Sequence, residues 1–118
     1  MKAQGLSDQE ILGVVQPLAE HTENAWNEKN YQEFIRYLID EHPDQVFPES
    51  EFNRQLEESY DALGKHTLAD LIHIHRNPDH VIVLWNVNFE HREEPGLLIY
   101  GFKEHKGNVL IEGCSYHA

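Results

Sequence analysis

Cysteine, basic residues and long apolar stretches are all scarce in this 118-residue chain. The single cysteine, Cys114, excludes a disulfide framework within one chain and favours a reducing compartment. The sequence contains no run apolar enough to span a membrane, and its first residues lack the apolar stretch of a signal peptide. We therefore expect a cytoplasmic protein.

Basic side chains are outnumbered by acidic ones, with 9 lysines and arginines against 21 aspartates and glutamates, so the formal net charge is −12. A charge of this sign repels phosphate groups, which argues against nucleic acid and membranes as partners. The sequence also lacks a glycine-rich phosphate loop, a Walker motif and a nucleophile elbow. Its length suits a single domain over residues 1–118, for which we expect no cofactor.

The first part of the chain has the signals of a long amphipathic helix. Ser7 and Glu10 form a capping box, which predicts that the helix begins here. Pro17 interrupts the pattern and predicts a kink or a break. The apolar or small residues that follow the cap recur at helical spacing: Ile11, Val14, Val15, Leu18, Thr22, Ala25 and Trp26.

Two shorter helices are predicted next. Asn30 caps the first of them, which is expected to end by His42 because the following proline disfavours helical geometry there. Residues 44–47 are predicted to form a linker or a very short strand. The third helix begins at Pro48 and ends at Gly64, a typical helix stop.

From Thr67 onward the apolar period changes from 3.6 to 2, which predicts strands. Short connections between the strands make neighbours antiparallel. The sequence therefore predicts an α+β fold in which three N-terminal helices pack on a curved four-stranded antiparallel sheet. The expected strands are Thr67–Arg76, His80–His91, Leu97–His105 and Asn108–His117, with turns at residues 77–79, 94–96 and 106–107.

Tight turns fix an expected pairing for each strand. The predicted pairs are Ile72 with Trp85, Asp70 with Val87, Phe89 with Tyr100, His91 with Leu98, Phe102 with Ile111, and Leu98 with Ser115. One face of the sheet then becomes apolar and is expected to form the core beneath the helices. Its members are Leu68, Ile72, Ile74, Val81, Val83, Trp85, Val87, Phe89, Leu98, Tyr100, Phe102, Val109 and Ile111.

Polar residues gather at one end of this predicted core face, which suggests a pocket that binds a small hydrophobic or amphipathic ligand. Asp70, with Tyr100, His91 or His117, is the candidate acid/base group. The candidate ligand contacts are Trp26, Tyr60, Trp85, Phe89 and Ser115. Two alternatives stay open: a pocket that binds without reacting, and a polar end that is simply open to water.

The opposite face of the predicted sheet is too apolar for water and too polar for a core. Such a mixture suits a subunit interface, so we expect a homodimer through this outer face. His73 and His75 have a spacing that can chelate a metal, but their place on this face favours interface or surface histidines and no metal site. The face comprises Ala69, Leu71, His73, His75, Ile82, Leu84, Asn86, Asn88, Leu97, Ile99, Leu110, Cys114 and Tyr116.

One stretch of the sequence resembles the nuclear-transport-factor-2-like superfamily, which includes SnoaL-type cyclases and ketosteroid isomerases. It consists of Ala25–Tyr31 followed by Phe34, Ile35 and Leu38, and it is similar to the end of helix 1, the turn and the start of helix 2 in that superfamily. The resemblance covers the element order of the whole chain. It implies a cone-shaped fold, a pocket between helices and sheet, and commonly a dimer. It also implies a small-molecule-binding domain or a proton-transfer enzyme of the isomerase, cyclase or dehydratase type. The alternative is a non-catalytic protein-interaction domain.

Overall fold

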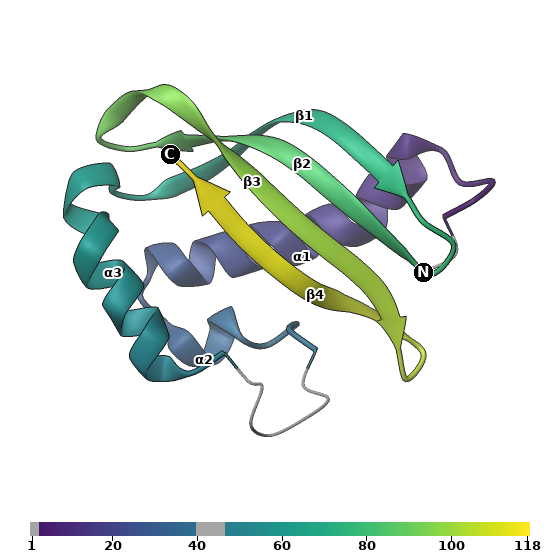
Figure 1. Cartoon of the computed structure of the whole chain (residues 1–118), viewed down its shortest axis with the longest axis horizontal. Coiled ribbons are helices and arrows are strands. Elements are labelled where there is room, and N and C mark those ends of the chain that lie inside the picture. Colours follow the sequence, from purple (N-terminus) through teal and green to yellow (C-terminus); the bar gives the residue numbers. More distant parts are fainter. Residues whose placement is uncertain (1–2, 40–46) are drawn as a thin grey trace.

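A computed structural model of the chain describes residues 3–39 and 47–118. Within them, three helices are followed by four strands, and the predicted α+β class is confirmed (Figure 1). The helices pack on a curved sheet whose strands follow the order β1-β2-β3-β4, all antiparallel. The elements are α1 (Asp8–Asn27), α2 (Tyr31–Phe34), α3 (Glu49–Leu63), β1 (His66–Arg76), β2 (His80–Phe89), β3 (Arg92–His105) and β4 (Asn108–His117).

Helix α1 begins at the predicted capping box. The amide of Glu10 donates to Oγ of Ser7 and the amide of Ser7 donates to Oε1 of Glu10, each at 3.1 Å. The helix runs for 20 residues with Pro17 inside it, so the predicted break does not occur. Val15 and Ala19 are buried on either side of the proline, and their packing outweighs the lost main-chain hydrogen bond. None of the described helices is long and apolar enough to cross a membrane.

Helix α2 ends at Phe34, which is earlier than predicted. The chain beyond it lies along the edge of β4 instead of continuing as a helix. There the amide of Ile111 donates to the carbonyl of Tyr37 at 2.8 Å, and the amide of Ile39 donates to the carbonyl of Ile111 at 2.9 Å. The predicted helix end at His42, and most of the predicted linker, lie outside the described residues.

Helix α3 follows Pro48 and ends at Gly64, as predicted. Gly64 has a φ of +73°, a region that favours glycine, and its amide donates to the carbonyl of Tyr60 at 2.7 Å. A β-carbon at this position would lie 2.7 Å from the side chain of Glu90. The end of α3 is therefore held close to the turn between β2 and β3.

Strand β1 has the predicted register near its turn and a different one beyond it. Ile74 pairs with Val83, as the tight turn requires. Further along, two irregularities add residues to β1, so that Leu71 lies opposite Trp85 and Leu68 lies opposite Val87. The predicted pairs Ile72–Trp85 and Asp70–Val87 are wrong. Ile72 is 49% exposed, so its assignment to the core is also wrong.

The turn between β2 and β3 comes earlier than predicted. Phe89 pairs with Arg92, so the turn lies at residues 90–91, and β3 begins at Arg92 rather than Leu97. The expected turn residues 94–96 lie inside β3. Between the pairs Phe89–Arg92 and Val87–Gly96, three residues of β3 face one residue of β2. Pro95 is tolerated there because a bulge leaves residues outside the ladder.

This earlier turn changes which residues of β2 and β3 are neighbours. Tyr100 lies opposite Val83 and Leu98 lies opposite Trp85, so the predicted pairs Phe89–Tyr100 and His91–Leu98 are wrong. The faces are nevertheless kept, because the shift leaves inward-pointing residues opposite one another. Val81, Val83, Trp85, Val87, Phe89, Leu98, Tyr100 and Phe102 are all buried, as predicted.

Strands β3 and β4 confirm one predicted pair, Phe102 with Ile111. A bulge then follows, because Gly101 pairs with Gly113 and Glu112 is left over. Leu98 therefore lies opposite Tyr116 rather than Ser115. The bulge turns Cys114 and Tyr116 inward, where they pack against the core, so their assignment to the outer face is wrong.

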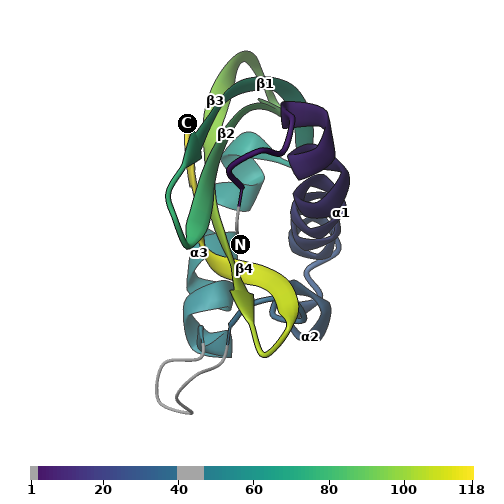
Figure 2. The same ribbon diagram turned by 90° about the vertical axis from the view of Figure 1, so that its right-hand side faces the viewer.

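The helices lie to one side of the sheet. Figure 2 shows α1 along one face, while no described helix lies against the opposite face. The buried side chains of α1 and the inner face of the sheet form one core around Trp85, Tyr100 and Phe102. A second cluster of Trp26, Phe34 and Phe52 joins α1, α2 and α3. The space between these two clusters holds the site described below.

Candidate functional site

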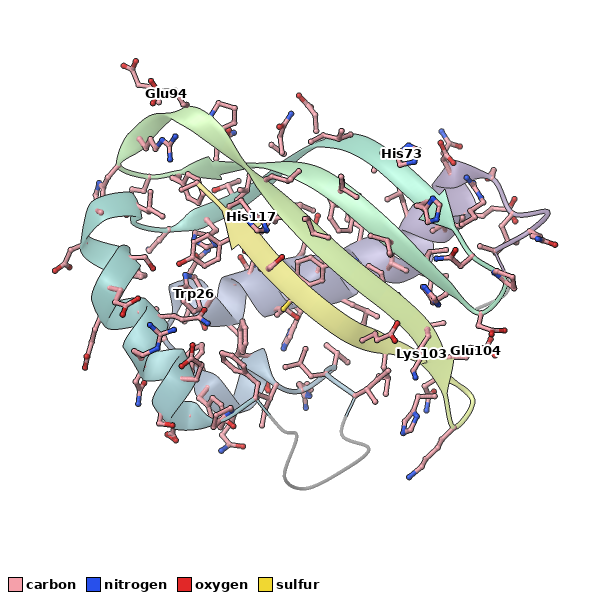
Figure 3. All side chains as sticks on the ribbon, in the orientation of Figure 1. Trp26, His73, Glu94, Lys103, Glu104 and His117 are labelled. Carbon is pink, nitrogen blue, oxygen red and sulfur yellow. The ribbon has the colours of Figure 1, made fainter. Side chains whose placement is uncertain are left out.

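A cavity of about 530 Å³ lies between the helices and the inner face of the sheet. Apolar side chains make up much of its wall, which is typical of small-molecule sites. They include Trp26, Phe34, Leu38, Phe47, Leu98, Ile111 and Tyr116. The carboxylate, guanidinium, amide and imidazole side chains at the wall are Glu23, Arg54, Gln55, His66 and Glu112. Trp26 lies near the end of α1, in the region bounded by α3 and β4 (Figure 3).

A buried carboxylate and a buried imidazole meet at this wall. Nδ1 of His66 lies 2.8 Å from Oε1 of Glu23, and the two side chains are 2% and 9% exposed. A carboxylate only accepts hydrogen bonds, so the proton of this contact belongs to Nδ1. In the neutral form of the imidazole the lone pair is then on Nε2, for which no hydrogen-bond partner is found among the described residues.

Tyr100 supplies the second hydrogen bond to the carboxylate. Its hydroxyl donates to Oε2 of Glu23, in the interior of the sheet. Burial, together with the negative charge of Glu23, raises the pKa of Tyr100 well above its ordinary value. The phenol therefore keeps its proton and remains a donor. Glu23 thus accepts one hydrogen bond at each oxygen, which compensates part of the cost of burying it.

Cys114 completes the polar group from β4. Burial is the first cause that raises the pKa of its thiol to about 12, and the charge of Glu23 is the second. The thiol is therefore protonated at neutral pH. A protonated thiol is a poor nucleophile.

The backbone of His66 is held by α1. Nδ2 of Asn27 donates to the carbonyl of His66, and the amide of His66 donates to Oδ1 of Asn27, both at 2.7 Å. The carbonyl of Asn27 in turn accepts from the hydroxyl of Tyr60 at 3.0 Å. One asparagine at the end of α1 therefore fixes the start of β1 at two points and links it to α3.

Aromatic rings enclose the imidazole of His66. Trp26 stacks on it with ring centroids 5.6 Å apart, and the rings of Tyr116 and Phe89 meet it edge to face at 4.9 and 5.2 Å. Such an enclosure excludes water from the imidazole and strengthens its electrostatic contact with Glu23. The residues that orient His66 come from α1, β2 and β4.

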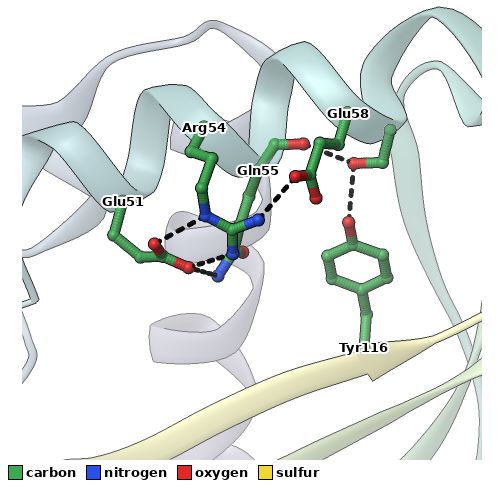
Figure 4. A network of polar contacts seen from close by, with 6 residues as sticks. Glu51, Arg54, Gln55, Glu58 and Tyr116 are labelled. Atoms are coloured by element: carbon green, nitrogen blue, oxygen red, sulfur yellow. Dashed lines mark hydrogen bonds and ion pairs between the residues drawn. The ribbon is translucent and has the colours of Figure 1, made fainter.

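At the rim of the cavity, the charge of Arg54 is already compensated. Its guanidinium binds the carboxylate of Glu51 through two nitrogens and that of Glu58 at 2.7 Å (Figure 4). The hydrogen bond from Arg54 is the main cause that lowers the pKa of Glu51 to about 2, and a bond from Gln55 adds to it. These partners lie at i,i+3 and i,i+4 on α3.

No protein-family model and no curated protein matches this chain. A variant of the designed protein Rd1NTF2_05 has a similar structure, with a TM-score of 0.60 and 16% sequence identity over 86% of this chain and 95% of the design. The chain has a nuclear-transport-factor-2-like fold. The structure of Bdellovibrio bacteriovorus Bd1075 aligns with a TM-score of 0.53 and 12% identity, over 87% of this chain but 38% of Bd1075.

In this NTF2-like fold, the residues predicted as an acid/base group do not come together. Asp70 is exposed in the bulged part of β1. His91 is exposed in the turn after β2, 3.5 Å from Glu90. His117 is exposed on β4, where its Nε2 lies 3.2 Å from Oγ of Ser115. Tyr100 alone is buried, and its hydroxyl contacts Glu23.

The predicted ligand contacts are divided between cavity and core. Trp26 and Ser115 are at the cavity wall. Tyr60 lies behind it, bonded to Asn27, while Trp85 is buried against Tyr100 and Phe102 in the core. Phe89 is buried too and reaches the site through its contact with the ring of His66.

Sequence reasoning missed Glu23 and His66. A signal for Glu23 was available, because it lies four residues after Ala19 and three before Trp26, on the buried stripe of α1. A glutamate on such a stripe needs a buried partner. His66 carries no comparable signal, since it stands at the boundary between a turn and a strand and its partner is 43 residues away.

The two histidines that suggested a metal site lie at another place in the NTF2-like fold. The ring centroids of His73 and His75 are 6.4 Å apart, and both side chains are exposed on β1. His73 is labelled in Figure 3. Over residues 3–39 and 47–118, no group of three potential metal ligands is found. Two imidazoles without a third ligand fall short of a zinc site.

Proposed function

We propose that this chain binds a small hydrophobic or amphipathic molecule in the cavity and that His66 exchanges a proton with it. The observation that carries the proposal is the buried Glu23–His66 pair, whose imidazole is held at the wall with Nδ1 bonded to the carboxylate. The reaction would be a proton transfer of the isomerase, cyclase or dehydratase type. The buried carboxylate and the apolar wall favour this reading over a non-catalytic interaction domain.

The proposed chemistry uses each group in one role. Nε2 of His66 accepts a proton from the bound molecule and later returns it to another atom of that molecule, so no net charge is left on the protein. Glu23 stabilises the imidazolium that exists between the two steps, and Tyr100 keeps Glu23 in place. Trp26 and Phe89 keep water away from the imidazole.

Histidine NMR provides the test, with naphthylethanol as a first probe. The probe is expected to raise the melting temperature and to shift the ring-nitrogen signals of His66. The exposed His73 and His75 are internal controls that should not move. A probe that stabilises the protein yet shifts His73 or His75 in place of His66 would show that ligands bind elsewhere, and the proposal would be wrong.

We also propose that the outer face of the sheet pairs with a second copy of the chain. The apolar side chains of this face are half-buried by neighbouring side chains of the sheet, because no described helix lies on this face. An apolar surface of this kind on an acidic, otherwise polar chain is typical of an interface. Its central side chains are Ile82, Leu84, Leu97, Ile99 and Leu110.

A further inference from the structure

The side-chain donors around the buried end of the cavity are already used within the protein. The hydroxyl of Tyr100 and Nδ1 of His66 both donate to Glu23. The thiol of Cys114 is only a weak donor. A ligand that lies against these groups therefore meets acceptors: the lone pair on Nε2 of His66 and the remaining lone pairs of the Glu23 carboxylate.

Tyr116 has no donor to offer either. Oγ of Ser59 donates to the carbonyl of Gln55 at 2.7 Å, so its single proton is committed. Oγ of Ser59 and the hydroxyl of Tyr116 are 2.6 Å apart, and Tyr116 must therefore be the donor in that contact. The indole N–H of Trp26 is unused, but that atom is buried away from solvent, so a molecule in the cavity does not reach it.

The charges at the cavity wall also favour a ligand that donates hydrogen bonds and carries a positive charge. Glu23 and Glu112 contribute two carboxylates. The guanidinium of Arg54 is bound by the carboxylates of Glu51 and Glu58, which leaves little positive potential for an anionic ligand. The net charge of −12 adds a long-range attraction for cations.

We infer that the ligand of this cavity is an organic cation with an N–H group, a protonated amine on an apolar body. This inference rests on the proposed ligand-binding function and specifies its chemistry. The ammonium would donate to Nε2 of His66 or to Glu23, and the apolar body would contact Phe34 and Leu98. The aromatic side chains at the wall suit such a ligand as well, because ring faces attract cations.

Three probes with one apolar body and different head groups test the inference: naphthylethylamine, naphthylethanol and naphthylacetate. Their dissociation constants are measured by calorimetry at neutral pH, where the first is a cation and the last an anion. A charge–charge contact of a few ångström near a protein surface outweighs partial desolvation, so the amine should bind about 10-fold tighter than the alcohol. Naphthylacetate should bind more weakly than both.

Variants show whether the wall carboxylates cause the preference. Glu23→Gln and Glu112→Gln each remove one negative charge at the cavity with little change in size. Glu94→Gln is the matched control, because Glu94 is 75% exposed on β3 and lies away from Trp26 (Figure 3). The ratio of alcohol to amine dissociation constants should fall in the first two variants and stay unchanged in Glu94→Gln.

The outcomes separate this inference from the function on which it rests. If the alcohol binds as tightly as the amine and shifts the His66 signals, the cavity binds ligands but the cation inference is wrong. If none of the three probes binds, the proposed function and the inference both fail. If Glu23→Gln does not fold, the test rests on Glu112→Gln. A ratio of alcohol to amine dissociation constants equal to that of the unmodified chain would then overturn the inference.

Discussion

Nδ1 of His66 lies 2.8 Å from Oε1 of Glu23, although 43 residues separate the two in the chain. The contact joins the last turns of α1 to the first residue of β1. Both side chains are buried, and each one compensates the cost of burying its partner. The polar site and the packing of helix on sheet therefore depend on the same pair of residues.

Replacing Glu23 by alanine should destabilise the fold. His66 and Tyr100 would both lose their partner while still buried, and an unsatisfied buried polar group costs about 1–3 kcal/mol. We expect a loss of about 2–5 kcal/mol in the free energy of unfolding, measured by urea denaturation. Glu20→Ala on the same helix is the control, because Glu20 is exposed and bonds Gln16 only at the surface. Equal effects of the two substitutions would contradict the assignment.

The two-point contact of Asn27 with the backbone of His66 should also stabilise the protein. Asn27→Ala removes both hydrogen bonds and leaves the amide and the carbonyl of His66 without these partners. A loss of about 1–3 kcal/mol is expected in urea denaturation. The amide of His66 should in addition exchange faster with solvent. Asn24→Ala, at an exposed position on α1, is the control and should change neither the free energy of unfolding nor the exchange rate of the His66 amide. An unaltered His66 exchange rate in Asn27→Ala would refute the role of the contact.

Much of the fold could be predicted because helix caps and tight turns leave local signals. The Ser7 capping box, the Gly64 stop and the turns at 77–79 and 106–107 are each fixed by residues within four positions of one another. The bulges in β1, β3 and β4 leave no such signal, since an extra residue in a ladder is decided by packing across strands. The register was therefore right near the first and the last turn and wrong beyond the bulges, while the turn between β2 and β3 was itself misplaced.

The site was less predictable than the fold for the same reason. Asp70 looked central only as long as β1 was assumed to pair without a bulge. Tyr116 looked external until the extra residue Glu112 turned it inward. Which polar groups share a cavity depends on register over the whole length of a strand, and one extra residue exchanges the two faces.

Cys114 should be unreactive in the folded protein. A pKa of about 12 in place of 9.0 reduces the thiolate at pH 8 by about a thousandfold, and the thiolate is the reactive form. Alkylation by iodoacetamide should therefore be slow in buffer and fast in urea. The raised pKa also makes stability depend on pH. Above about pH 9 the thiol loses its proton in the unfolded state and keeps it in the folded state, so this group lowers the stability of the fold as the pH rises. Fast alkylation in buffer would contradict the raised pKa of the thiol.

Glu51 should stay ionised in acid because Arg54 binds it. Its pKa is lowered from 4.5 to about 2, so the folded state binds this proton less readily than the unfolded state does. The stabilisation by this pair is complete above about pH 4.5 and is lost as the pH falls toward 2. In Arg54→Gln, the pKa of Glu51 measured by carboxyl NMR should rise toward 4.5. Glu57 is exposed on the same helix and makes no ion pair with Arg54 in the described part of the chain, so its carboxyl signal is the control.

A charge on the outer face of the sheet should prevent association of the proposed dimer. Leu84 lies on β2 opposite Ile99 of β3, in the middle of this face. Leu84→Lys would place an ammonium in an interface core, where charged residues are depleted because their desolvation is costly. Light scattering at micromolar concentration is expected to show a dimer for the unmodified chain and a monomer for the variant.

Val14→Lys is the control: Val14 is apolar and 45% exposed, but it lies on α1 rather than on the sheet, so this variant should remain a dimer. A monomer already in the unmodified chain would remove the homodimer, and the half-buried apolar residues of the outer face would then need water or another partner to cover them.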